Sequence, residues 1–331
     1  MTPLAPHLAA FFQVRLPLER QVSPHTLSSY AYAFQLLLDF ARARLGVPPS
    51  ALHLEQIDAS LVLAFLEHLE VKRNNSVLSR NARLAAIKSF MRFVEYRVPS
   101  AIEQVRCVLA VPEKKSDEKL VNHLNLAEMQ AVLDAPDPHS RYGIRDRAML
   151  HLAFTAGLRV SELVGLRSVD FTLHSPSSST ILILGKGRRE RALPLTRDTT
   201  QAIRNWLAVR GSARTPELFL NARGHQLTRA GFEYVLSKHV EAASAKCPSL
   251  SSKTVSPHSL RHTCAMIILR ATRDIRKVSL WLGHASIRST EIYTRADPTD
   301  KLETLEAITP PSLRRGRFQP PDRLMALLKE V

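Results

Sequence analysis

The segment His258-Ser259-Leu260-Arg261-His262 places an arginine close to two histidines that stand four residues apart. Two histidines at this spacing on one face of a helix can bind zinc, as in the H-E-x-x-H motif. Ser259 stands where that motif has its glutamate, however, and no obvious third ligand follows. The segment therefore does not predict a zinc site, and its meaning depends on the rest of the chain.

Three further segments accompany it, and none of them is specific by itself. They are Thr155-Ala156-Gly157-Leu158-Arg159-Val160-Ser161-Glu162-Leu163, Gly185-Lys186-Gly187, and Leu282-Gly283-His284 with Tyr293 nine residues later. Taken alone, Arg159 and Glu162 could form a surface ion pair of little energetic weight. Lys186 could be a solvated hairpin tip, His284 a helix-cap histidine and Tyr293 a packed helix residue. Their joint order and spacing make coincidence improbable.

Together the four segments resemble the Arg…Lys…His-x-x-Arg…His…Tyr signature of the tyrosine site-specific recombinases, or phage integrase family. The resemblance extends over most of Leu124 to Ala296. It implies an enzyme that cleaves and rejoins DNA strands through a covalent 3′-phosphotyrosine intermediate. The positions that match the catalytic set are Arg159, Lys186, His258, Arg261, His284 and the nucleophile Tyr293, with Glu162 as a supporting residue.

The chemistry of this reaction explains why it needs these residue types. Attack on a phosphodiester builds negative charge on the non-bridging oxygens, and Arg159 and Arg261 would supply fixed guanidinium donors for it. A tyrosine hydroxyl has an ordinary pKa of about 10, so attack at neutral pH needs nearby positive charge and a proton acceptor. Lys186 could protonate the leaving 5′-oxygen, and histidines with pKa values near neutrality could move protons. Because the phosphotyrosine ester retains the energy of the broken bond, we expect no metal, nucleotide or other cofactor.

The chain carries a formal net charge of +16 over its 331 residues. Such a field attracts polyanions and strengthens binding to phosphate backbones at low salt. A basic protein with no nucleic-acid partner is the alternative on charge alone. Because aromatic residues make up only 6% of the chain, we expect double-stranded DNA as the partner rather than a single strand held by base stacking. The predicted DNA contacts are Arg80, Arg83, Lys88, Arg188 and Arg189.

Helical patterns dominate the first hundred or so residues. A helix after the cap Ser23-Pro24 and another after the cap Asp58 carry apolar residues on a helical period. A third, over Ser79 to Tyr96, has an apolar stripe, and we expect its arginines and lysine to face solvent. An ordinary solvated face is the alternative to a phosphate-contact face here.

The second half of the chain combines helices with three short β-type segments, over Val169–Leu173, Thr180–Leu184 and Arg191–Leu195. The predicted fold is therefore mainly α with a small antiparallel β-sheet. The polar segment 112–122 predicts a linker between two domains. The family resemblance implies that residues 1–111 form a helical core-binding (SAM-like) DNA-binding domain, that 123–309 form the catalytic domain and that 310–331 form a C-terminal tail.

Cysteine usage and hydropathy bear on location. The three cysteines form no CxxC pair, which argues against a disulfide framework and a cysteine zinc site and fits a reducing bacterial cytoplasm. Met1 to Ala10 has no secretory pattern, and no apolar run reaches the roughly 18 residues that a spanning helix needs. We expect a cytoplasmic protein without a membrane partner.

Strand exchange between two sites requires four active sites, so the resemblance implies a homotetramer on paired DNA sites. A partner recombinase or an accessory DNA-bending protein could assist it. The tail could dock on a neighbouring protomer through Leu324, Leu327 and Leu328, with packing in cis as the alternative. The expected role is integration, excision or transposition of a mobile element.

Two other functions remain open at this point: a type IB topoisomerase with similar chemistry, and a DNA-binding protein without catalytic activity. The retained Tyr293 argues against the second. Several residues depart from the usual family pattern, namely Cys264, Met266, the glycine-free turn Arg270–Arg273, and Trp281. We expect these departures to affect packing rather than chemistry.

Overall fold

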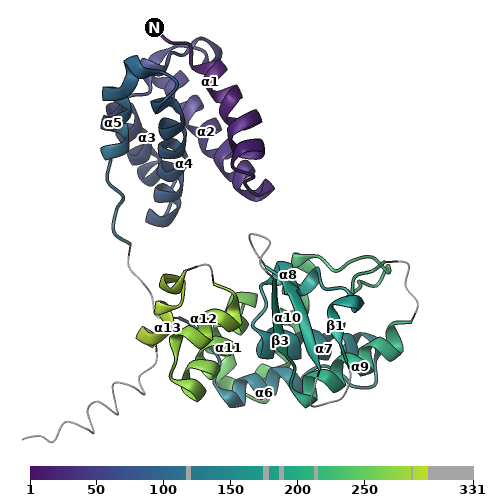
Figure 1. Ribbon diagram of the computed structural model, residues 1–331. Coiled ribbons are helices and arrows are strands. Elements are labelled where there is room, and N and C mark those ends of the chain that lie inside the picture. The colour runs from purple at the N-terminus through teal and green to yellow at the C-terminus, as the bar shows by residue number, and fades with distance from the viewer. Residues whose placement is uncertain (117–120, 174–178, 186–189, 212–214, 285, 297–331) are drawn as a thin grey trace, which may run out of the picture. The chain divides into compact units, whose positions relative to one another are not determined.

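The structure is a computed structural model that describes residues 1–116, 121–173, 179–185, 190–211, 215–284 and 286–296 (Figure 1). The chain divides into two compact units, Met1–Glu118 and Lys119–Val331. Some predictions fall on residues outside the described ranges. These are Lys186, Arg188, Arg189 and the tail over residues 310–331.

The first unit is helical. Its elements are α1 (Leu4–Ala10), the π-helical η1 (Phe11–Glu19), α2 (Pro24–Leu45), α3 (Ala59–Val71), α4 (Val77–Glu95) and α5 (Ile102–Ala110). The predicted caps are in place: the Ser23 hydroxyl accepts a hydrogen bond from the Thr26 amide, and the Asp58 carboxylate accepts one from the Leu61 amide at 2.7 Å. Each cap satisfies an amide that the first turn of a helix leaves free, which fixes where the helix begins.

Aromatic rings from three helices form the centre of this unit. The Phe11 ring lies 5.4 Å from the Phe90 ring, edge to face, and Phe34 lies 5.3 Å from Phe90. These three side chains are almost completely buried. Burial of a phenylalanine contributes about 1.5–3 kcal/mol, so this cluster holds η1, α2 and α4 together.

The expectation that Arg80 faces solvent was wrong. Arg80 is only 3% exposed, and its guanidinium donates to the Pro112 carbonyl at 2.9 Å. The neighbouring Asn81 exchanges two hydrogen bonds with the Lys114 backbone, and the Lys114 ammonium pairs with Glu70 at 2.8 Å. The segment after α5 therefore returns along α4 and covers Arg80, a contact between residues 32 positions apart that helical periodicity does not reveal.

The second unit combines eight described helices with the predicted small sheet, and the mainly α fold with an antiparallel sheet is confirmed. The helices are α6 (Leu126–Asp134), α7 (Arg141–Ala156), α8 (Val160–Val164), α9 (Arg197–Arg210), α10 (Arg229–Ser244), α11 (Pro257–Thr272), α12 (Ile275–Leu282) and α13 (Glu291–Ala296). Helix α7 packs against α9 and α11, and Figure 1 shows α11, α12 and α13 gathered side by side.

The sheet has the order β1 (Phe171–Thr172), β2 (Thr180–Leu184), β3 (Glu190–Pro194), and both pairings are antiparallel. Ile181 pairs with Leu193 and Ile183 with Arg191, so these four side chains share one face. That face packs on the core, because Ile181, Ile183 and Leu193 are buried. Arg191 therefore points inward, next to apolar neighbours.

A buried polar group ties α7 to α10. The Asp146 carboxylate accepts two hydrogen bonds from Arg145, at 2.7 and 2.9 Å, and its other oxygen lies 2.9 Å from the His239 imidazole. Arg145 also donates to the Leu220 carbonyl at 2.7 Å. All three side chains are buried, so the guanidinium depends on Asp146 for its counter-charge.

We predict that Asp146→Asn destabilises the second unit by about 3 kcal/mol, because it leaves the Arg145 charge buried without its partner. The measurement is denaturant unfolding followed by tryptophan fluorescence, since both tryptophans, Trp206 and Trp281, belong to this unit. The control is Glu233→Gln, which removes an exposed pair with Arg229 and should cost less than about 1 kcal/mol. Equal losses in the two variants would contradict this account of the buried group.

Candidate active site

Five of the six predicted catalytic residues lie within the described part of the chain, on separate elements of the second unit. Arg159 precedes α8, His258 and Arg261 lie on α11, His284 follows α12, and Tyr293 lies on α13. The structure brings four of them, Arg159, Arg261, His284 and Tyr293, together around the loop that ends α12, and the His258 ring lies 6.3 Å from the ring of His262, one helical turn further along α11. Arg261 donates to the Leu282 carbonyl at 2.7 Å, Arg159 to the Gly283 carbonyl at 3.4 Å, and the His284 ring is stacked on the Tyr293 ring.

The end of α7 places Arg159. Gly157 ends the helix with a left-handed backbone (φ 58°), where a Cβ would come within 2.6 Å of the Leu282 side chain and 3.0 Å of the Cys264 sulfur. Glycine fits this close approach because it has no side chain and adopts positive φ without strain. Two residues later the chain enters α8, so Arg159 stands at the N-terminus of that helix.

Arg261 is a fixed cation at the centre of the site. Its guanidinium donates to the carbonyls of Gly157 and Leu282, and the residue is 4% exposed. Burial, with the positive charge of Arg159 nearby, lowers the pKa of Arg261 to about 10. The group remains charged at pH 7, held by two carbonyls that come from different motifs.

Glu162 holds Arg159 in place through hydrogen bonds. Its carboxylate accepts from the Arg159 guanidinium at 2.7 Å and from the Arg159 amide at 3.0 Å. The same carboxylate accepts a hydrogen bond from the Arg191 guanidinium at 2.8 Å. Burial acts to raise the pKa of Glu162, but the hydrogen bonds from Arg191 and Arg159 outweigh it and leave the pKa below its ordinary value. The carboxylate is therefore ionised at pH 7 and fixes two arginines at once.

Sequence reasoning missed Arg191. Its side chain is only 10% exposed, and its Nε is buried without a hydrogen-bond partner among the described residues. A Cβ at Gly283, where φ is +63°, would come within 2.8 Å of Arg191 Nη1, so the glycine leaves room for this guanidinium beside the loop. The signal was present in the strand pattern: Arg191 alternates in phase with the buried Leu193, which places it on the inner face.

The Tyr293 side chain is buried, with 1% of the residue exposed. Burial raises the pKa of Tyr293 to about 12, although the positive charge of Arg261 acts in the opposite direction. Its hydroxyl lies 2.9 Å from Nδ1 of His262, a residue that the motif comparison left out of the catalytic set. In the sequence, this contact is indicated only by the four-residue spacing of His258 and His262, which places both side chains on one face of α11.

His284 packs against the other side of Tyr293. Its ring is nearly parallel to the Tyr293 ring, 6.4 Å away, and its Nδ1 lies 2.8 Å from the Thr290 hydroxyl. Burial, followed by the charges of Arg261 and Arg159, lowers the pKa of His284 to about 4. The pKa of the exposed His258 is also lowered, by partial burial and then by Arg229 and Arg261. His284 is therefore neutral at pH 7, in contrast to the near-neutral pKa that the sequence suggested, and the pKa of His258 is shifted in the same direction.

Two of the departures from the family pattern share one acceptor. The Trp281 indole donates to the Thr155 carbonyl at 3.1 Å, and the Cys264 thiol donates to the same oxygen at 3.4 Å. Burial raises the pKa of Cys264 to about 12, so this thiol stays protonated. Of the other two cysteines, Cys107 is exposed and Cys247 is partly exposed.

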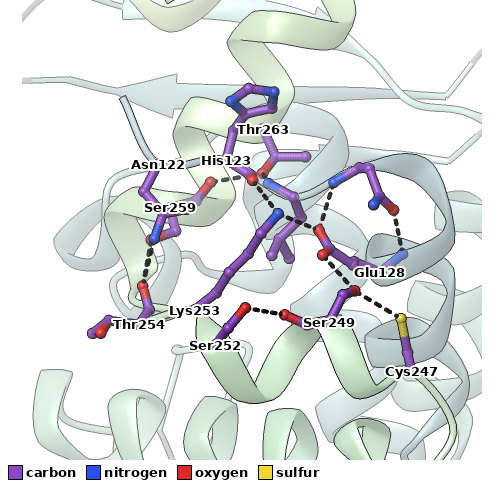
Figure 2. Close-up of polar contacts among 12 residues, drawn as sticks. Asn122, His123, Glu128, Cys247, Ser249, Ser252, Lys253, Thr254, Ser259 and Thr263 are labelled. Carbon is purple, nitrogen blue, oxygen red and sulfur yellow. Dashed lines mark hydrogen bonds and ion pairs between the residues drawn. The ribbon is translucent and has the colours of Figure 1, made fainter. Parts of the chain in front are cut away.

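Figure 2 shows how the chain is fastened where it enters the second unit. The buried carboxylate of Glu128 accepts from the Lys253 ammonium at 2.7 Å, and the same ammonium donates to the His123 carbonyl at 3.1 Å. The Asn122 amide donates to the Thr254 carbonyl at 3.1 Å. These bonds hold the entering segment against the residues that precede α11, the helix that carries His258 and His262.

Within the described ranges, no group of three or more His, Cys, Asp or Glu side chains is arranged to hold a metal ion. The helices in those ranges also include none with the length and apolar character needed to cross a membrane.

Comparisons with known proteins identify the family of the chain. The model of the Phage integrase family matches residues 122–300, and that of the phage integrase N-terminal SAM-like domain matches residues 9–97. The chain is 44% identical over 328 residues to the integrase/recombinase y4rC of Sinorhizobium fredii. The aligned region covers 99% of this chain and 98% of that protein. It is 34% identical over 311 residues to the tyrosine recombinase XerC of Pelobacter propionicus, covering 94% of this chain and 97% of that protein.

Among solved structures, the fold is similar to the XerH site-specific recombinase bound to its palindromic difH substrate. The TM-score is 0.69 at 24% sequence identity, over 87% of this chain and 81% of that chain. The family models and the relatives together cover both units described above. The chain thus belongs to the phage integrase family and is a DNA recombinase of the tyrosine type.

Proposed function

We propose that this recombinase cleaves and rejoins DNA through a covalent bond between the Tyr293 hydroxyl oxygen and a 3′-phosphate. One observation carries the proposal: Arg159 and Arg261, fixed by different elements, bind successive carbonyls of the loop Leu282–Gly283 that also leads to the Tyr293 helix. Two guanidiniums in this arrangement offer several N–H donors to one phosphate.

The proposed reaction balances without a cofactor. The Tyr293 hydroxyl gives its proton to a neutral histidine of the site, His258 or His284, as its oxygen forms a bond to phosphorus and the bond from phosphorus to the 5′-oxygen breaks. Arg159 and Arg261 stabilise the charge on the non-bridging oxygens. Lys186 gives a proton to the leaving 5′-oxygen. In rejoining, a 5′-hydroxyl gives its proton to Lys186 and attacks the phosphotyrosine ester, and the histidine returns its proton to Tyr293. Glu162 contributes by holding Arg159 and Arg191 in place.

Double-stranded DNA is the proposed substrate, and XerH, which has the same fold, was solved on its DNA site. We propose Arg83 and Lys88 on α4 as phosphate contacts, together with Arg188 and Arg189. Arg83 lies over the Tyr32 ring at 5.1 Å, which orients its guanidinium but leaves it partly exposed. Arg80 is left out because it is buried against Pro112.

The proposed assembly is a homotetramer on paired sites in the bacterial cytoplasm, with a partner recombinase or DNA-bending protein as an optional helper. We propose that it integrates, excises or transposes a mobile element, in keeping with the name of the relative from Sinorhizobium fredii. The similarity to XerC supports a second candidate, the resolution of chromosome dimers. The DNA sequence that the protein cleaves distinguishes the two.

We predict that Tyr293→Phe abolishes covalent attachment to DNA, at least about a hundredfold, while DNA binding changes less than about twofold, because only the reacting oxygen is lost. The protein is incubated, in excess chelator, with a library of random duplexes that each carry one nick. Adducts that survive denaturation are recovered, digested with protease and sequenced.

The wild-type protein should yield adducts on a restricted set of sequences, and that set identifies the element served. Adducts with Tyr293→Phe would disprove the nucleophile assignment, and a strict need for added magnesium would disprove the mechanism. Adducts on unrelated sequences, with rapid plasmid relaxation, would indicate a topoisomerase.

We also predict that the double variant Arg83→Glu, Lys88→Glu weakens DNA binding and flattens its salt dependence. Each lost phosphate contact should lower the slope of log K against log[salt] by about 0.9. The control is Arg42→Glu, Arg106→Glu, which makes the same charge change at exposed positions on α2 and α5. An equal change of slope in the control would show that the effect comes from net charge alone and would contradict phosphate contacts by Arg83 and Lys88.

The tail is tested by deletion of residues 314–331. If this segment docks on a neighbouring protomer, the truncated protein should bind a single site within about twofold of the full chain but assemble paired sites at least about tenfold less well. Gel-shift titration with one or two sites per duplex measures both. Full assembly by the truncated protein would exclude docking in trans.

A further inference from the structure

The hydroxyl of Tyr293 has one hydrogen-bond partner among the described residues, and it is His262. The two side chains come from α13 and α11, with 2.9 Å between the hydroxyl oxygen and Nδ1. Their rings meet edge to face with centroids 5.5 Å apart. His284 stacks on the same tyrosine but directs its Nδ1 to Thr290, so it does not compete for the hydroxyl.

This hydrogen bond joins two neutral groups. Burial, followed by the charges of His258 and Arg261, lowers the pKa of His262 to about 4, and burial raises that of Tyr293 to about 12. At pH 7 the phenol is therefore protonated and the imidazole is uncharged, so the hydroxyl donates and Nδ1 accepts. The pair lacks the charge that would make the oxygen a strong nucleophile.

The pocket around the pair keeps DNA away from the oxygen. Tyr293 is 1% exposed and belongs to an apolar cluster that includes Cys264 and Leu282, with Val121 packed against its edge. A groove of about 420 Å³ lies next to it, lined by residues that include Asn122, His258 and His262. The groove is lined by His262 but not by Tyr293. A scissile phosphate cannot meet an oxygen in this position until the side chain is released.

From this geometry we propose that His262 is a positioning residue that holds the Tyr293 hydroxyl in a protected position while no DNA is bound. Release from His262 is then part of the activation of the nucleophile. The inference rests on the proposed role of Tyr293, and it concerns the protein before DNA binds. A leucine at position 262 would leave a buried hydroxyl without a partner, which favours conformations in which the tyrosine is exposed.

The test uses the full chain without DNA. Tetranitromethane, which nitrates reactive tyrosine side chains, is added at pH 8, and the rate at Tyr293 is followed by peptide mass spectrometry. Tyr234, which is 72% exposed, serves as the internal standard. The variants are His262→Leu, His262→Asn and the control His151→Asn, which changes a partly buried histidine on α7 that is not in contact with the pair.

We expect nitration of Tyr293 to be at least about fivefold faster in His262→Leu than in the wild type, the factor that corresponds to one lost hydrogen bond of about 1 kcal/mol. His262→Asn should stay within about twofold of the wild type, because the asparagine side-chain oxygen can occupy the place of Nδ1. The His151→Asn control should not differ from the wild type.

Two outcomes overturn the proposal. One is an unchanged rate in His262→Leu, and the other is an equal rise in His262→Leu and His262→Asn, which would assign the effect to packing. Tryptophan fluorescence unfolding identifies a variant that has merely lost stability, and a rise explained by unfolding counts against the proposal. The nitration result does not depend on adduct formation, so a failure of Tyr293 as nucleophile would appear separately, in the Tyr293→Phe experiment.

Discussion

Two positive charges must be held next to each other in the absence of DNA, and the architecture of the second unit depends on this requirement. Burial and, after it, the nearby positive charge of Arg159 lower the pKa of Arg261, so the two guanidiniums lie close enough to repel each other. Like charges repel more strongly where water is excluded. The protein offsets the repulsion with the carboxylate of Glu162 and with carbonyl oxygens at the ends of two helices.

These compensating groups explain why the motifs are dispersed along the chain. The carbonyl of Gly157 ends α7, that of Leu282 ends α12, and Arg191 comes from the sheet. Each segment supplies one of the groups around the two arginines, and no segment supplies them all. The glycines at 157 and 283 allow the segments to approach, because a side chain at either position would collide with a neighbour. At both positions glycine is therefore required twice, by the positive φ and by the close approach of a neighbouring side chain.

The sequence was sufficient for features that depend on local chemistry. The caps Ser23 and Asp58 predicted where two helices begin, and the alternation in β2 predicted the sheet, because both depend on neighbours a few residues away. It was insufficient where a partner is distant. The burial of Arg80 requires Pro112, and the contact of His262 requires Tyr293, 31 residues further along. Helical spacing places His258 and His262 on one face but does not determine which of them meets the tyrosine.

The uneven exposure of the three cysteines has a practical consequence for studying DNA engagement. Cys107 in the first unit and Cys247 in the second are accessible to different degrees, whereas Cys264 is buried and its thiol remains protonated. Thiolates, not thiols, react with maleimides, so Cys264 should remain unlabelled. The natural chain thus carries one attachment point for a dye in each unit. Energy transfer between a donor and an acceptor at these two sites would report whether the distance between the dyes changes when duplex is added, without engineered cysteines.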